Sequence, residues 1–198
     1  MVQGGRKRRV KIQERARWEI DRTISEFNPR ATTVCQKGCA HCCYFNVDIN
    51  VLEAERLIDI IRRMPEDRRK EIKRRLGAAN EAYRQADQQE SIYRHPCPFL
   101  EGAECSIYED RPLNCRSHVS TDVAYCIAEL NTKKGTLSAG DPGVTPEAMQ
   151  GNLAWHIVLH SIAAAAHNLI GDAGSMPAAL LKRMSIERRS EKSDSTIN

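Results

Sequence analysis

The chain has 198 residues, of which 41% are hydrophobic, 28% charged and 5% aromatic. This composition is typical of a globular protein, because it is too apolar for a disordered chain and too polar for a membrane protein, and the length predicts one domain. The formal net charge of +4 is too small to indicate a partner. The unusual feature is eight cysteines behind an N-terminus without a secretory signal, so we expect a cytoplasmic protein whose reduced thiols bind metal.

The N-terminal segment is predicted to form an amphipathic helix over residues 6–27, because apolar side chains recur there with helical spacing. Pro29 ends this pattern. The basic run at residues 6–9 is interpreted as a solvated chain end, which is the usual state of such runs. We therefore expect no nucleic-acid partner.

A helical hairpin is predicted next. Asn50 can cap a helix that begins at Val51, and Glu53 stands at the third helical position, where it completes a capping box. Pro65 ends this helix, and the acidic residues behind it favour the start of a second helix. The core faces would consist of Leu57, Ile58 and Ile61 in the first helix and of Ile72, Leu76, Ala79, Tyr83 and Ala86 in the second.

Beyond the hairpin we expect an irregular segment over residues 91–120, where Pro and Gly interrupt any periodicity. A short helix is predicted over about 120–130 and a Gly/Pro loop over 135–144. Thr145 can cap a long helix that ends before Gly171. Because its apolar part contains histidines, this helix is interpreted as buried in the protein and not as a membrane span.

These elements predict an all-α fold, a small helical domain with irregular cysteine-rich loops over residues 1–184. The sequence shows no internal repeat and no alternation of strands with helices. Residues 185–198 are charged and rich in serine, so we expect a disordered tail there.

Four cysteines stand within nine residues, namely Cys35, Cys39, Cys42 and Cys43, and Gly38 permits a tight turn among them. Thiolates form at neutral pH only beside positive charge, and a metal can hold several at once. Eight buried, reduced core thiols would be the structural alternative, but the first set lies among Lys, Gly and His instead of apolar residues. The second, wider-spaced set consists of Cys97, Cys105, Cys115 and Cys126.

Sulfur ligands select zinc, copper(I) or iron–sulfur clusters. Structural zinc sites usually use two C-x2-C pairs, and this chain has one clear pair, Cys39 and Cys42. Three thiols with C-x3-C-x2-C spacing and a distant fourth suit a 4Fe–4S cluster, which we favour, with zinc as the alternative. The expected cluster ligands are Cys35, Cys39, Cys42 and Cys115, and a second thiolate site would be completed or supported by Cys43, Cys97, Cys105 and Cys126.

Other assignments carry less support. Radical S-adenosylmethionine enzymes share the C-x3-C-x2-C spacing, but the sequence does not indicate the strands of their barrel. His156 and His160 stand four residues apart on a predicted helix and are interpreted as core or partner-binding residues. His41 and His118 lie near cysteines, where they can serve as extra ligands or donate hydrogen bonds to sulfur.

A family pattern emerges from four blocks: the first cysteine set, Glu53 at the start of a helix, Cys97-Pro98-Phe99-Leu100, and the stretch from Cys105 to Arg116. Over roughly residues 30–120 the chain thereby resembles the YkgJ-like cysteine-cluster family, a zinc- or iron-chelating domain named for its CxxCxxCC pattern. The resemblance implies a metal site, and for some members iron–sulfur oxidoreductase activity. A related cysteine motif occurs in bacterial flagellin lysine methylases.

Two arginines of the last block are candidate cofactor-binding residues. Arg111 and Arg116 would offset the negative charge of a thiolate-bound cluster or bind an anionic substrate. A salt bridge with Asp110 or Glu109 is the structural alternative. Apolar cover over a cluster would come from Phe99, Leu100 and Ile107.

We therefore expect a metal-binding protein, first of all an iron–sulfur protein with a redox role or a role in cluster-supported modification. It could be an iron–sulfur oxidoreductase or an accessory protein. The alternative is a zinc-stabilised interaction module without catalysis. The partner would be another protein or a small-molecule substrate, and no membrane is involved.

Overall fold

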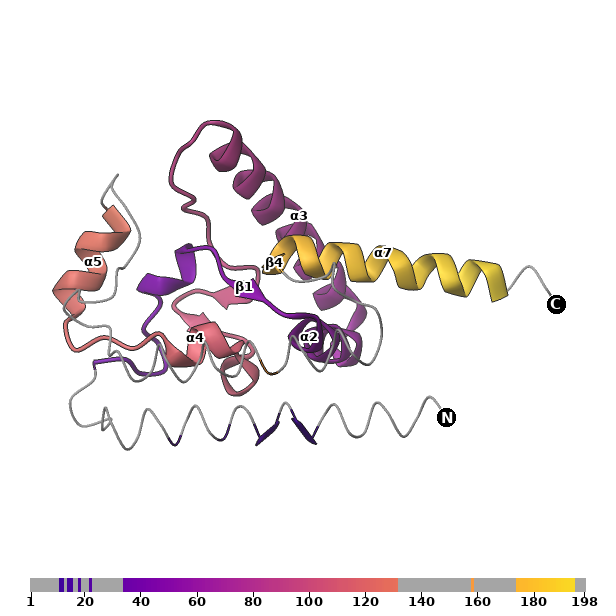
Figure 1. Ribbon diagram of the computed structural model, residues 1–198, viewed down its shortest axis with the longest axis horizontal. Coiled ribbons are helices and arrows are strands. Elements are labelled where there is room, and N and C mark those ends of the chain that lie inside the picture. The colour runs from indigo at the N-terminus through magenta and orange to yellow at the C-terminus, as the bar shows by residue number, and fades with distance from the viewer. Residues whose placement is uncertain are drawn as a thin grey trace.

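The computed structural model describes residues 34–131 and 174–194, together with positions 11, 12, 14, 15, 18, 22 and 158. This part of the chain is mostly helical, and it also contains short strands (Figure 1). Its elements are η1 (His41–Tyr44), β1 (Asp48–Ile49), α2 (Val51–Arg63), α3 (Glu66–Gln88), β2 (Leu100–Glu101), β3 (Glu104–Cys105), η2 (Tyr108–Asp110), α4 (Leu113–Ser117), α5 (Val123–Asn131), β4 (Gly174–Ser175) and α7 (Met176–Asp194).

The predicted helical hairpin is confirmed, including the way in which its first helix begins. The side-chain oxygen of Asn50 accepts hydrogen bonds from the N–H groups of Leu52 and Glu53, both at 3.0 Å. The carboxylate of Glu53 accepts the N–H of Asn50 at 3.0 Å, which completes the capping box. The helix α2 ends at Arg63, before Pro65, as predicted.

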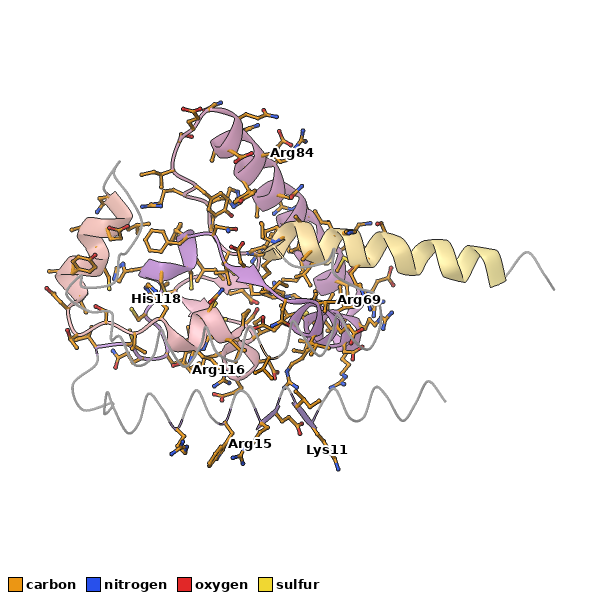
Figure 2. The ribbon with its side chains drawn as sticks, in the orientation of Figure 1. Lys11, Arg15, Arg69, Arg84, Arg116 and His118 are labelled. Carbon is orange, nitrogen blue, oxygen red and sulfur yellow. The ribbon has the colours of Figure 1, made fainter. Side chains whose placement is uncertain are left out.

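The helix α3 buries the face that its periodicity predicts. Ile72, Leu76 and Ala79 are fully buried, and Tyr83 is half-buried. At the start of α3, the guanidinium of Arg69 donates to the backbone carbonyls of Arg62 and Met64 at 3.2 and 3.1 Å (Figure 2). Because carbonyls at a helix end lack partners within the helix, this contact closes α2 and ties it to α3.

The helix α7 covers both members of the hairpin, and the sequence pattern did not predict its first part. It packs on α2 and α3 through the buried side chains of Met176, Ala179 and Leu180. Arg183 forms an ion pair with Glu55 of α2 at 2.7 Å. The apolar stripe spans only about two turns, too few for periodicity to indicate a helix. The helix continues to Asp194 and so extends into residues 185–198, for which a disordered tail is expected.

The all-α prediction needs one correction, because two antiparallel strand pairs join the helices. Strand β1 pairs with β4, with Asp48 opposite Ser175 and Ile49 opposite Gly174. Because α7 begins directly after β4, this pairing positions the start of α7 against the core. Strands β2 and β3 form a hairpin in which Gly102 adopts a φ of +60°, a conformation that favours glycine. Strands of two residues are too short to show an alternating pattern in the sequence.

The segment 91–120, expected to be irregular, also contains η2 and α4. Phe99 and Ile107 belong to the main core cluster, and Leu100 is buried as well. The predicted short helix near residues 120–130 is confirmed as α5. In the predicted helix over residues 6–27, the described positions 11, 12, 14, 15, 18 and 22 are helical.

The predicted loop over 135–144 and nearly all of the predicted long helix that begins at Thr145, including His156 and His160, lie outside the described residues. Within the described residues, no helix has the length and apolar character needed to cross a membrane.

Candidate metal centre

All eight cysteines are free thiols, and all are partly buried. Cys35 and Cys39 flank a turn in which Gly38 has a φ of +93°, so the predicted tight turn at this glycine is confirmed. Cys42 and Cys43 follow in η1, whose hydrogen bond from Cys43 N–H to Ala40 O measures 3.0 Å. The sequence motif is therefore a glycine turn that runs into one turn of 3-10 helix.

The second cysteine set is brought to the first by the backbone itself. The N–H of Cys97 donates to the carbonyl of Cys43 at 2.7 Å, and the N–H of Leu100 donates to the carbonyl of Cys97 at 2.9 Å. Cys105 lies in β3, Cys115 in α4 and Cys126 in α5. The cysteine-bearing segments of both sets thus meet in one region of the fold.

Four thiols form a group in which every pair interacts electrostatically. We call this group the inner tetrad, and it consists of Cys42, Cys97, Cys105 and Cys115. Its members come from four separate segments: η1, the loop before β2, β3 and α4. Cys97 and Cys105 also pack against the main core cluster, so the tetrad borders the hydrophobic core.

Burial and mutual repulsion hold the inner tetrad in its protonated form. Burial raises the pKa of Cys97 to about 12. It also raises the pKa of Cys105, and it raises that of Cys115 well above its usual range. The pKa of Cys42 lies well above its usual range because of a hydrogen bond with the Cys43 thiol and because of burial. A thiolate form of this group therefore requires a cation to compensate the charge.

Arg111 supplies one positive charge to the inner tetrad. Its guanidinium lowers the pKa of Cys42, Cys105 and Cys115, against the larger effect of burial. The side chain is held by the carbonyl of Tyr108, which accepts its Nε–H at 3.0 Å, and by the Tyr108 ring, 3.8 Å from the guanidinium carbon. Arg111 thus favours the thiolate form of three of these cysteines, whereas its predicted role toward a bound cluster or an anionic substrate stays a prediction.

Three further thiols interact electrostatically with one another and are called the outer triad: Cys35, Cys39 and Cys126. The N–H of Ser120 donates to the sulfur of Cys35 at 3.1 Å, and the Ser120 side chain forms a hydrogen bond with Cys126. Burial raises the pKa of both Cys35 and Cys126. Cys42 interacts with both of these thiols as well, so η1 stands between the two groups.

One arginine links the helix α5 to the segment that follows η1. The Arg94 guanidinium carbon lies 4.3 Å from the centre of the Phe45 ring, directly after η1. The same side chain donates to the carbonyl of Glu129 in α5 at 3.1 Å. Arg94 thereby joins the residue that follows η1 to α5, the helix that carries Cys126.

Comparison with known families places these thiols in one recognised domain. A model of the CxxCxxCC family, described as a "putative zinc- or iron-chelating domain", matches residues 34–136, more than half of the chain. The chain belongs to this family. The resemblance found in the sequence is therefore confirmed, and the family description supports metal binding. No match was found among curated proteins or solved structures.

The CxxCxxCC domain groups its thiols differently from the ligand sets expected from their spacing. Cys115 interacts with Cys97 and Cys105, which were expected in the second site. Cys126 interacts with Cys39, and Cys35 interacts with Cys126. No group of three or more His, Cys, Asp or Glu residues in the described part of the chain is spaced to hold a metal ion as it stands. The assignment of ligands therefore stays a prediction.

Arg116 has a structural position in the CxxCxxCC domain. Its side chain is buried at α4, and it donates to the backbone carbonyl of Glu109 (Figure 2). Asp110, the other acidic neighbour considered from the sequence, forms an ion pair with Arg56 of α2 at 2.5 Å. Arg116 therefore helps to hold the turn from η2 into α4.

The histidines near the cysteines differ in their surroundings. Burial lowers the pKa of His118, so its imidazole is neutral at neutral pH. His41 begins η1, next to Cys42. Whether either one is a ligand stays a prediction.

Sequence reasoning missed the contacts by which three residues support the cysteine-bearing segments. Ser120 contacts the outer triad, and Arg94 ties α5 to η1. Glu53 was recognised as a helix cap, but it also accepts a hydrogen bond from the N–H of Leu113 in α4 at 2.7 Å. The only sequence signal was the inclusion of Glu53 in the family pattern, because the other contacts join residues far apart in the chain.

Proposed function

We propose that the inner tetrad binds a 4Fe–4S cluster and that the protein is an iron–sulfur redox protein. The observation that carries this proposal is that four thiols from four separate segments interact electrostatically with one another. Their donor atoms are all sulfur, which selects soft metals and iron–sulfur clusters. The corners of a cube need ligands from several directions, and η1, the loop before β2, β3 and α4 provide four.

The division of the only clear C-x2-C pair favours iron–sulfur over zinc at this site. Structural zinc commonly uses two such pairs as knuckles. Here Cys42 belongs to the inner tetrad, whereas its pair member Cys39 interacts with Cys126 of the outer triad. The inner tetrad therefore contains no zinc knuckle, which supports the cluster.

The surrounding residues suit a redox cluster. Such a cluster takes up and releases single electrons, and its potential depends on burial and nearby charge. Phe99 and Ile107 exclude water on the core side, next to Cys97 and Cys105. Arg111 offsets negative charge on the thiolate ligands. Arg111 would stabilise the more negative, reduced state of the cluster, whereas the apolar cover of Phe99 and Ile107 disfavours that state and lowers the potential.

Metal analysis of protein purified without oxygen tests this proposal. We expect brown protein with iron and acid-labile sulfide in equal amounts, about four of each per chain. Electron paramagnetic resonance of the reduced protein should show a cluster signal. In Cys97→Ser most of this iron should be lost, whereas Lys37→Ala, an exposed change in the first cysteine loop, should retain it. Colourless protein with stoichiometric zinc and no iron would contradict the proposal.

A zinc-stabilised interaction module is the second candidate, and one observation favours it. Cys39 and Cys42 have the C-x2-C spacing of a zinc knuckle, and Cys35 and Cys126 both interact with Cys42. This set of four thiols would suit structural zinc. Zinc that is lost in Cys126→Ser but retained in Cys97→Ser would support this candidate.

A further inference from the structure

Glu53 has a buried carboxylate that connects two helices. Only 7% of its surface is exposed. One carboxylate oxygen accepts the backbone N–H of Asn50 at 3.0 Å and the side-chain amide of Asn50 at 2.8 Å. The other oxygen accepts the N–H of Leu113 at 2.7 Å. The first two contacts belong to the cap of α2, but the third reaches the first residue of α4.

The helix α4 depends on such contacts for its position. It has five residues, and a helix of this length is not stable by itself. Beside the bond from Leu113 to Glu53, the side-chain amide of Asn114 donates to the carbonyl of Asp48 in β1 at 2.7 Å. Figure 1 shows α4 beside β1, in agreement with the contacts between these elements. Both anchored residues immediately precede Cys115, which carries one thiol of the inner tetrad.

We propose that Glu53 is a positioning residue, which fixes α4 and thereby holds the thiol of Cys115 in the inner tetrad. Its relevance to metal binding rests on the function proposed above, but the position of the thiol can be tested without metal. A residue of this kind acts through the ligand that it orients, and its loss typically weakens metal binding 10–100-fold.

The chemistry of the three hydrogen bonds explains why a glutamate serves here. A capping box accepts Glu or Gln equally, because it uses one side-chain oxygen. At this position both oxygens accept from N–H donors, and only a carboxylate offers two acceptors. In Glu53→Gln the amide oxygen can still cap α2, but the amide NH2 then faces the N–H of Leu113. This variant therefore removes the link to α4 selectively.

The experiment compares full-length wild-type protein with Glu53→Gln and with Ile72→Val. Ile72 is fully buried in α3, so the latter variant perturbs the core at a residue outside α2 and α4. The first measurement is the rate at which anaerobically reconstituted protein loses iron to a chelator. We expect 10–100-fold faster loss in Glu53→Gln and less than twofold change in Ile72→Val. The resonance spectrum of the reduced cluster should change in Glu53→Gln only.

The second measurement does not require metal. Mass spectrometry follows alkylation of individual cysteines in the full chain, and we expect about tenfold faster alkylation of Cys115 in Glu53→Gln. Cys97 and Cys105 should change less than twofold. If Glu53→Gln does not fold, an ester in place of the Pro112–Leu113 amide removes the same N–H donor and keeps every side chain.

The outcomes separate the two proposals. Wild-type protein that binds neither iron nor zinc would refute the proposed function, and alkylation of Cys115 would then decide the role of Glu53 by itself. If Glu53→Gln accelerates the reaction of all three thiols equally, or behaves like Ile72→Val in both measurements, Glu53 is only a structural cap and the positioning role is refuted.

Discussion

The inner tetrad and the outer triad consist of the same side chain in one small domain, but different parts of the fold support them. Cys97 and Cys105 pack against the main core, and α4 with Cys115 is anchored to α2 and β1. The outer triad depends on Ser120 and on α5, which Arg94 connects to η1. The inner tetrad should therefore share the stability of the core, whereas the outer triad should open locally at a lower free energy.

This difference separates the proposed metal site, the inner tetrad, from a less firmly held thiol group, the outer triad. Because η1 carries Cys42, which interacts with members of both groups, a change in one group can reach the other through this single turn. The following predictions test how independent the two groups are, beginning with the largest expected effect.

The strongest test is a pair of serine substitutions, one in each group. Cys115→Ser should remove most of the bound iron, because a buried ligand is lost and its position in α4 offers no substitute. Cys126→Ser should retain most of the iron. Measurement of iron and sulfide per chain distinguishes them. Equal losses in both variants would mean that thiols of both groups serve one centre, and the division proposed here would be wrong.

The affinity for metal should depend steeply on pH, and the dependence should be steeper for the inner tetrad than for the outer triad. Burial raises the pKa of Cys97 to about 12 and raises those of Cys105 and Cys115, so these thiols carry protons that metal binding must displace. For each proton released, affinity should rise about tenfold per pH unit. Titration of the apo-protein with zinc, in buffers of different protonation enthalpy, counts the protons. Release of less than one proton per metal would contradict this prediction.

Glu53 should make the stability of the inner region depend on pH. Burial raises its pKa to about 7, against the opposing hydrogen bonds from the N–H groups of Asn50 and Leu113. Between about pH 4.5 and pH 7 the folded chain therefore holds a proton that the unfolded chain has released, and the ionised carboxylate that accepts all three hydrogen bonds predominates in the folded chain above about pH 7. The protonated Glu53 stabilises the folded state relative to its ionised form, and this contribution is fully present below about pH 4.5. As the pH rises from about 4.5 to about 7 the contribution is lost, and the free energy of unfolding falls by up to about 3 kcal/mol.

Urea unfolding of wild-type protein and Glu53→Gln across this pH range measures the effect. The variant has no titrating group at this position, so its stability curve should be flatter than that of the wild type. Parallel curves for the two proteins would assign the pH dependence to other groups.

Arg111 should tune the inner centre without being required for its assembly. Arg111→Gln removes a positive charge that acts on three thiols, so the reduced cluster should be destabilised by about 1 kcal/mol and the reduction potential should fall. Redox titration followed by visible absorption measures the shift. Arg74→Gln, an exposed arginine paired with Glu71 in α3, serves as control and should leave the potential unchanged.

The smallest effect is expected for the contact that supports the outer triad. Arg94→Ala removes the packing on Phe45 and the hydrogen bond to Glu129, which should cost about 1 kcal/mol or less. Alkylation of Cys126 should become several-fold faster, while that of Cys115 should not change. A similar acceleration at Cys115 would show that the two thiol groups open together.

Local patterns were sufficient to predict the helical hairpin and the turn at Gly38. The cap formed by Asn50 and Glu53, the break at Pro65 and the buried face of α3 all involve residues within a few positions of one another. The family was also evident from the cysteine blocks. In contrast, strands of two residues and the five-residue α4 carry too few side chains to show a periodicity.

The sequence by itself determined the CxxCxxCC family, its eight cysteines and the helical hairpin within the matched residues, because spacing and periodicity are properties of neighbouring residues. Only the tertiary structure decided that Cys115 joins Cys97 and Cys105, while Cys126 joins Cys35 at Ser120. The same holds for the link from Glu53 to α4. Such groupings follow from how separate segments dock on the core, and spacing along the chain carries no direct record of that docking.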